Sequence, residues 1–327
     1  MGSLDIKDKK ILYELDRNCR QTDSQIARKV RLSRDSVRYR INKLVEEGYI
    51  NYFMVILNSM KLGYQWYRTF FKFRNLDLKK EEEILKYFEK KVSWITKVEG
   101  IWDLNTGIFC KSVYKYRDFI NECLTKYEDY IDNYRVSIVT RMWHYSRDYL
   151  LGKKSSNPIF GIMGYSPKED YSSKEIDNTD YKILQVLLKN ARMNIVDIAN
   201  KTKTTEMIVK YRIKNLQERG IILGFRPFLN IKKLGYSYFK VHFYLCNLSH
   251  EKKEEIFSFI HHHPNTVHTT ELVGGADLET EFQVKNNEEL YSYLKEIRVK
   301  FGNYIKFHEL LEYTDELKFT YLPEMEF

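Results

Sequence analysis

The sequence is poor in the features that mark secreted proteins, membrane proteins and disulfide-rich domains. Its 327 residues include only four cysteines, and these show neither a C-x-x-C pair nor a disulfide framework for a chain of this size. No apolar run approaches the roughly 18 residues that cross a bilayer. The opening stretch MGSLDIKDKK has no hydrophobic signal region, and Ile6 stands where a myristoylation signal has Ser or Thr. We therefore expect a soluble, cytoplasmic protein without membrane partners and with reduced thiols.

Motifs for catalysis and metal binding are also scarce. The sequence has no nucleophile motif, no phosphate-binding loop and no run like the RNP1 motif of RNA-binding sheets. The histidines of HHHPNTVH (261–268) have no neighbouring Cys or acid, and three adjacent side chains cannot all face one ion. Favourable charge at a helix C-terminus explains them as well. We expect no metal, no cofactor and no enzyme activity.

Positive charge is present, and it is local. The whole chain carries a net charge of +9 and is 43% hydrophobic, which suits more than one folded domain and a polyanionic partner. A lysine-rich genome would give a similar total without any binding. However, residues 23–45 carry net +5, whereas residues 226–327 carry net −4. The first of these segments is the better candidate for contact with a polyanion.

The chain is an internal duplication. The segment LDIKDKKILYELDRNCR (4–20) aligns with IDNTDYKILQVLLKNAR (176–192) at an offset of 172 residues, and GIWDL (100–104) aligns with GGADL (274–278) at an offset of 174. Between the copies, residues 152–173 gather Pro and Ser and predict a linker.

In each copy the spacing of the hydrophobic residues changes once, from a purely helical pattern to one that alternates strands and helices. Residues 5–48 have helical spacing, with capping signals at Thr22 and Ser33 and a terminating Gly48, and YINYFMVILN then predicts the paired strands of a wing. From Tyr67 the order is strand, helix, strand, strand, helix, strand. The predicted fold class is α+β, with two copies of a winged helix-turn-helix followed by a βαββαβ ferredoxin-like domain. The predicted domains are 1–57 and 174–229 for the winged helix-turn-helix units, and 58–151 and 230–327 for the ferredoxin-like units.

The third helix of each copy predicts contact with the DNA major groove. In SRDSVRYRINKLVEEG (33–48), Val37, Ile41, Leu44 and Val45 form the buried stripe, which turns Ser36, Tyr39 and Lys43 outward. The alternative, a solvated basic face, is weakened because the same frame returns in TEMIVKYRIKNLQERG (205–220). The predicted DNA-binding residues are Arg31, Ser33, Arg34, Ser36, Arg38, Tyr39, Arg40 and Lys43 in the first copy, and Lys203, Thr205, Ile208, Lys210, Tyr211, Arg212 and Lys214 in the second.

The chain resembles the leucine-responsive regulator family, Lrp/AsnC. The resemblance rests on LDIKDKKIL, on IARKVRLSRDSVRYRINKLVEEGYI and on the Gly-x-x-Asp of VEGIWDL. It implies a winged helix-turn-helix that binds double-stranded DNA, and ferredoxin-like domains that associate within or between chains. It also implies a small effector, such as an amino acid, near Gly100 and Asp103 and near Gly274 and Asp277. A plain Asx turn explains the same four residues. The tandem fusion departs from the family, whose members usually carry one unit per chain.

We expect a sequence-specific DNA-binding transcriptional regulator. Two alternatives remain. Siroheme decarboxylases resemble a pair of such units and would use His or Arg residues between them, for which His144, His242 and His308 are candidates. An interaction module would use the helix-turn-helix for protein contact only. The basic third helices favour the regulator over both.

Overall fold

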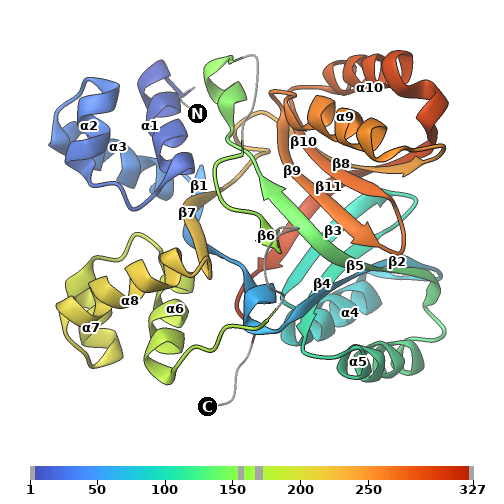
Figure 1. Cartoon of the computed structure of the whole chain (residues 1–327), viewed down its shortest axis with the longest axis horizontal. Coiled ribbons are helices and arrows are strands. Elements are labelled where there is room, and N and C mark those ends of the chain that lie inside the picture. Colours follow the sequence, from blue (N-terminus) through green and yellow to red (C-terminus); the bar gives the residue numbers. More distant parts are fainter. Residues whose placement is uncertain (1–3, 154–157, 166–171, 324–327) are drawn as a thin grey trace.

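The computed structural model of the protein describes residues 4–153, 158–165 and 172–323. Its first helix-turn-helix consists of α1 (Ile6–Arg17), α2 (Asp23–Val30) and α3 (Arg34–Glu46), followed by strand β1 (Ile50–Leu57). The second consists of α6 (Asn178–Lys189), α7 (Ile195–Thr202) and α8 (Glu206–Glu218), followed by β7 (Ile222–Leu229). Figure 1 shows the two units side by side at one end of the molecule, with β1 and β7 between them. The structure thus confirms the α+β fold class and the repeated helix-turn-helix.

Local signals explain where these helices begin and end. The Asp5 carboxylate and the Thr22 hydroxyl each accept a hydrogen bond from the third residue of the following helix, and the side chains of Asp8 and Gln25 bond back, so both helices begin with a capping box. Arg31 ends α2 in the left-handed conformation, with φ 56°, and Lys203 does the same after α7, with φ 54°.

The strand after each helix-turn-helix differs from the prediction of a paired wing. β1 is a single strand that pairs antiparallel with β7 of the other copy, for example Val55 opposite Phe225. A lone strand leaves its backbone hydrogen-bonding groups unpaired, and the equivalent strand of the other copy satisfies them. The two copies therefore share one two-stranded sheet.

The remaining strands form a closed barrel. The first copy supplies β2 (Gln65–Phe73), β3 (Trp94–Gly100), β4 (Leu104–Cys110) and β5 (Ile131–His144), and the second supplies β8 (Ser237–Leu245), β9 (Thr266–Val273), β10 (Leu278–Val284) and β11 (Ile305–Phe319). The sheet order is β2-β4-β3-β11-β8-β10-β9-β5-β6, and β5 also pairs with β2, which closes the ring. Pairs β3–β11 and β5–β9 join the copies. The sheets of the two copies thus join edge to edge.

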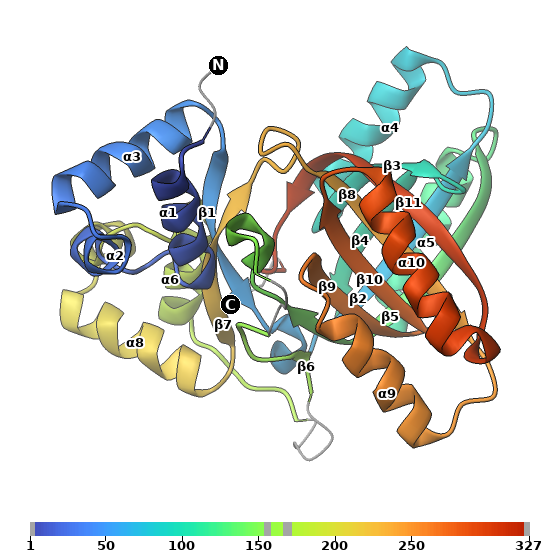
Figure 2. The same ribbon diagram turned by 90° about the horizontal axis from the view of Figure 1, so that it is seen from above.

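Four helices cover the outside of the barrel. α4 (Leu78–Lys91) and α5 (Val113–Lys126) lie on the strands of the first copy, and α9 (His250–His261) and α10 (Asn287–Phe301) on those of the second (Figure 2). Separate apolar clusters fill these two layers, one around Phe71, Phe88 and Phe119 and one around Phe243, Phe282 and Phe301. Because the helices cover the apolar face of each sheet, the other face lines the barrel interior.

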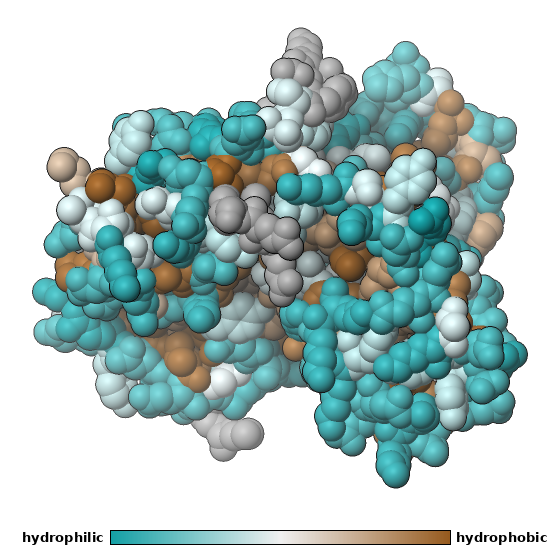
Figure 3. Space-filling model, turned by 90° about the horizontal axis from the view of Figure 1, so that it is seen from below, coloured by the Kyte–Doolittle hydropathy of each residue, from teal (hydrophilic) through white to brown (hydrophobic). Residues whose placement is uncertain are grey.

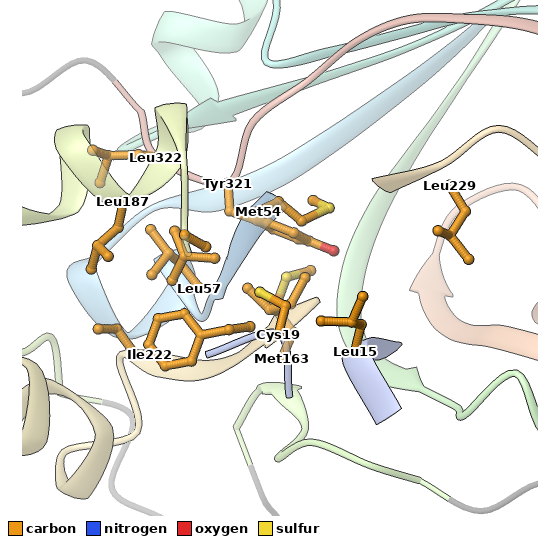
Figure 4. Packing of buried hydrophobic residues seen from close by; sticks show 14 of the residues in the cluster. Leu15, Cys19, Met54, Leu57, Met163, Leu187, Ile222, Leu229, Tyr321 and Leu322 are labelled. Atoms are coloured by element: carbon orange, nitrogen blue, oxygen red, sulfur yellow. The ribbon is translucent and has the colours of Figure 1, made fainter. Parts of the chain in front are cut away.

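A third apolar cluster ties the helix-turn-helix units to the barrel. This cluster contains side chains from α1, β1, α6 and β7 together with Tyr321 and Leu322, which follow β11, and Figure 4 shows Tyr321 beside Met54 of β1 and Leu322 beside Leu187 of α6. The predicted linker, 152–173, lies partly outside the described residues. Its described part contains β6 (Met163–Gly164), which pairs with β5 and places Met163 in this cluster. The domain boundaries given above stay predictions.

Candidate nucleic-acid interface and barrel interior

Helix α3 presents a basic outer face on an apolar base. Val37, Ile41 and Leu44 are at most 5% exposed, whereas Val45, predicted to be buried with them, is 40% exposed. Arg34, Arg38, Tyr39 and Lys43 are exposed and Ser36 is half-buried. Ser33 serves as the helix cap, because its hydroxyl accepts a hydrogen bond from the Ser36 backbone nitrogen at 3.1 Å.

The arginines of α3 differ in their contacts. Arg34 makes no ion pair with any described residue. Arg38 Nε lies 3.2 Å from Asp23 Oδ2, with half its side chain exposed. Arg40 instead holds α3 to the start of α1, with Nη1 at 2.8 Å from Asp5 and 2.7 Å from Asp8. Arg40 therefore has a structural partner, and its role in DNA binding stays a prediction.

Helix α8 keeps the cap and the anchoring arginine of α3, but its charged residues differ. Thr205 caps it, and Arg212 pairs with Asp177 at 2.8 Å, as Arg40 does with Asp5. Lys210 and Lys214 face Glu206 and Glu218 of their own helix. Met207 is 77% exposed, Ile208 39% and Tyr211 64%. On the face shown in Figure 3, hydrophobic side chains are scattered over both halves of the molecule among mostly hydrophilic surface.

Reciprocal contacts fix the two helix-turn-helix units to each other. Arg20 Nη1 donates to the carbonyl oxygens of Ala191 and Met193, and Arg192 Nη1 donates to those of Cys19 and Gln21. These residues are equivalent at the offset of 172. Arg192 also pairs with Asp23 at 2.6 Å. The units consequently form one body, and α3 and α8 have a fixed relative position.

The aspartates of the two Gly-x-x-Asp turns accept hydrogen bonds from the backbone of the neighbouring strands β2 and β8. Asp103 Oδ2 accepts a hydrogen bond from the Phe73 nitrogen at 2.7 Å, and Lys72 Nζ contacts Oδ1 at 2.6 Å. Asp277 Oδ2 accepts one from the Leu245 nitrogen at 2.7 Å. Gly100 and Gly274 have positive φ, as the turn requires. These contacts explain the motif structurally, and the predicted effector role of the four residues stays a prediction.

The barrel interior contains a charged cluster that the sequence did not reveal as a site. Lys240 Nζ lies 2.9 Å from Glu279 and 3.2 Å from Glu281, and Arg68 Nη1 lies 2.5 Å from Glu279. Burial alone would raise the pKa of Glu279, but Lys240, His242 and Arg68 lower it to about 2. The only sequence signal was the alternation of KVH (240–242) and ETEFQ (279–283), which is typical of a strand with one polar face.

A second charged group joins the barrel to the first helix-turn-helix. Asp16 on α1 is fully buried, and its carboxylate accepts hydrogen bonds from Arg147 and from Arg226 Nη2, the latter at 2.6 Å. Burial raises the pKa of Asp16, but the two guanidinium groups outweigh it and lower the value. Breaking a buried pair of this kind costs about 3–5 kcal/mol.

The histidines suggested for the enzyme alternative do not meet. His144 is buried at one end of the barrel, where its Nε2 lies 2.8 Å from the Tyr321 hydroxyl, and burial lowers its pKa well below the ordinary value. His242 lies 3.2 Å from Glu309 inside the barrel. His308 packs on Phe243 in the outer layer. The residue that does approach His144 is His268, at 5.0 Å between ring centres.

Sequence comparison connects the chain to bacterial and archaeal regulators. A family profile described as winged helix-turn-helix DNA-binding matches residues 4–51 and 176–222. The HTH-type transcriptional regulator FL11 of Pyrococcus furiosus is 31% identical over 119 residues, which are 36% of this chain and 78% of that protein. The HTH-type transcriptional regulator LrpB of Bacillus subtilis is 29% identical over 130 residues, or 40% of this chain and 85% of that protein.

Structural comparison gives a different neighbour. The crystal structure of the siroheme decarboxylase NirDL matches 98% of this chain and 94% of its own, with a TM-score of 0.63 and 16% sequence identity. At this identity the likeness shows a shared fold. The expectation that the chain is not an enzyme is nevertheless contradicted, because an enzyme uses this fold over almost its whole length. Among the described residues, no helix is long and apolar enough to cross a membrane.

Proposed function

We propose, on the premise that the chain belongs to the Lrp/AsnC family of winged helix-turn-helix regulators, that it is a transcriptional regulator that binds specific DNA sequences mainly through α3. The observation that carries the proposal is the outer face of α3, where Arg34, Arg38 and Lys43 surround Tyr39 while the opposite side is buried. Cations on this face suit phosphates, and the central side chains suit base edges.

The second helix, α8, is proposed to read DNA more weakly. Glu206 occupies the place of Arg34 and repels phosphate, and Ile208 replaces Ser36. An apolar side chain can still contact a thymine methyl group in the major groove. Because the two units form one body through Arg20 and Arg192, unlike helices are presented to one duplex. We therefore expect a site made of two unlike half-sites.

The test is selection of bound duplexes from a random pool, followed by a salt series on the selected sequence. Replacing Arg38 with Ala is expected to weaken binding to all sequences and to reduce the salt slope by roughly 1, whereas Tyr39→Ala is expected to change the preferred sequence. The matched control is Lys210→Ala at the equivalent place in α8, for which we expect the smaller effect. Unchanged affinity and slope in Arg38→Ala, with normal circular dichroism, would contradict the role of α3. Recovery of a perfect palindrome would contradict the unlike half-sites.

A second candidate function is decarboxylation of a tetrapyrrole, as named for the structural neighbour. The full-length likeness in fold favours it, together with buried Arg and His side chains where the copies meet. The cavity in that region is about 50 Å³, far too small for a macrocycle, so the barrel would have to open. An absorption titration of the purified protein with iron-uroporphyrin and siroheme tests this function. A saturable shift of the tetrapyrrole bands, followed by loss of carboxyl groups in the product, would establish it.

A further inference from the structure

A cavity lies at the end of the barrel next to the shared β1–β7 sheet. Its volume is about 50 Å³, and its lining comes from both copies. A single water requires about 10–15 Å³ measured in this way, so the space equals roughly four waters, or about 120 Å³ of liquid. The cavity can therefore hold one small organic molecule.

Three side chains on the cavity wall keep a hydrogen-bond donor without an acceptor among the described residues. These atoms are Arg68 Nε, Arg226 Nη1 and Gln283 Nε2. The side chains are at most 2% exposed, so bulk water does not reach them. Trp66 Nε1 also lacks an acceptor, but it packs against Gly107 and is not among the donors assigned to a ligand. Burying a donor without a partner is costly, so a ligand that supplies acceptors is favoured.

The rest of each side chain is held in place. Arg226 uses Nε and Nη2 to bind Asp16, at 3.1 and 2.6 Å. Gln283 Oε1 accepts hydrogen bonds from Arg147 Nε at 3.0 Å and from the Tyr149 hydroxyl. Because the amide oxygen is occupied by donors, the Gln283 amide nitrogen has a fixed direction. The donors are thus positioned before any ligand binds.

The two acidic side chains on the cavity wall, Glu281 and Glu316, do not offer a free carboxylate to a positively charged ligand group. The Glu281 carboxylate already pairs with Lys240 and His268. It also accepts hydrogen bonds from the hydroxyls of Tyr238 and Tyr313. Burial raises the pKa of Glu316 to about 7, so this side chain is protonated in mildly acidic solution. An ammonium group would therefore find no free carboxylate at pH 6. The remaining wall is apolar and includes Met54, Ile56, Phe228, Leu229 and Ile231.

We propose that this cavity binds a small organic carboxylate with a short apolar tail and no ammonium group. The carboxylate oxygens accept from Arg226, Arg68 and Gln283, and the tail lies against the β1–β7 residues. The site is independent of DNA binding by α3, so either proposal can fail while the other holds. The ligand class differs from an amino acid in one group, which makes the test sharp.

The experiment is calorimetric titration of the full chain at pH 6 with 4-methyl-2-oxopentanoate, L-leucine and inorganic phosphate. The first two share a skeleton and differ by an oxo group in place of the ammonium. We expect one molecule of the oxo acid to bind per chain, and both other probes to bind at least roughly tenfold more weakly. Equal or tighter binding of leucine overturns the ligand class, equal or tighter binding of phosphate overturns the role of the apolar wall, and no binding of any probe overturns the site.

Gln283→Glu identifies the cavity as the place of binding. The new carboxylate keeps the acceptor for Arg147 and Tyr149 but replaces the donor with a negatively charged oxygen, so oxo acid binding is expected to fall at least tenfold. Gln185→Glu makes the same charge change on the exposed surface of α6 and is expected to bind normally. If Gln283→Glu does not fold, Ile231→Phe fills the cavity instead and is expected to abolish binding. Unchanged binding in the folded variant places the ligand elsewhere and overturns the proposal.

Discussion

The two copies contribute opposite charges to the ion pairs that join them within the barrel. Among the described strands of the barrel, three ion pairs join one copy to the other, and in each the arginine belongs to the first copy and the glutamate to the second. These pairs are Arg68–Glu279, Arg135–Glu309 and Arg141–Glu271. A symmetric barrel built from two first copies would bring arginines together without their acids. The comparison shows that the halves have become complementary partners and are no longer interchangeable.

Helices α3 and α8 also differ between the copies, on their outer faces. Both are held by an arginine that pairs with the cap of the preceding first helix, Arg40 in one and Arg212 in the other. Their inner faces are equivalent, but Arg34, Asp35 and Ser36 become Glu206, Met207 and Ile208. The buried side of each unit is thus preserved while its outer side diverges. This is the pattern expected when fold and recognition are under separate constraints.

The largest expected effect comes from removing one charge of the complementary barrel. Glu279→Gln leaves Arg68 and Lys240 buried without this counter-charge, and we expect the free energy of unfolding to fall by about 3–5 kcal/mol. Urea denaturation at pH 7 measures it. As a control, Glu82→Gln removes an exposed ion pair with Lys86 on α4 and is expected to leave the midpoint nearly unchanged. A loss below about 1 kcal/mol would mean that the barrel does not depend on its opposite charges.

The second-largest effect is expected at Glu316, whose carboxyl group is buried. Burial raises the pKa of Glu316 to about 7 from an ordinary value of 4.5, so its protonated form stabilises the fold at low pH, and this contribution is lost as pH rises from about 4.5 through 7. Glu316→Gln keeps the acceptor for Trp94 Nε1. We expect the variant to match the wild type at pH 4.5 and to exceed it by about 1–3 kcal/mol at pH 8.

This measurement must use the difference between variant and wild type. Burial lowers the pKa of His261 and His263 to about 4, and their contribution to stability rises with pH between about 4 and 6.5. These histidines act against Glu316 in the same range and cancel in the difference. A difference that stays constant from pH 4.5 to 8 would show that Glu316 ionises normally.

Giving α3 the charges of α8 tests the difference between the helices. Arg34→Glu with Lys43→Asn copies two residues of the second unit onto the first, and we expect DNA affinity to fall roughly a hundredfold and the salt slope by about 2. Fluorescence anisotropy over a salt series measures both. Since neither side chain has a buried partner, thermal stability should not change. Wild-type affinity would show that α3 and α8 bind DNA equally or not at all.

The smallest effect is expected from the reverse change. Glu206→Arg with Ile208→Ser gives α8 the residues of α3, and we expect a gain of about tenfold in affinity together with more similar half-sites. Selection from a random pool reads out both properties. Half-sites as unlike as before would indicate that other residues of the second unit determine its preference.

Local patterns predicted the helices well but not the way in which the strands meet. The capping residues Thr22 and Ser33 and the stripe of Val37, Ile41 and Leu44 lie close in sequence, so their geometry follows from helical periodicity. The pairing of β3 with β11 joins residues more than two hundred positions apart, and no periodicity records a partner at that distance. Polar alternation at Lys240 and His242 is typical of a strand with one polar face, but the closure that encloses this face depends on the same distant pairings.

Because the barrel closes within one chain, its assembly does not depend on the concentration of the protein. A homodimer of single units separates on dilution, and its stability cannot be stated without the concentration of its subunits. Here β3–β11, β5–β9 and β1–β7 join halves of one polypeptide. Tethering makes each of these pairings a first-order event. The folded unit therefore persists at any dilution, so a cell holding only a few copies of the protein still holds them fully assembled.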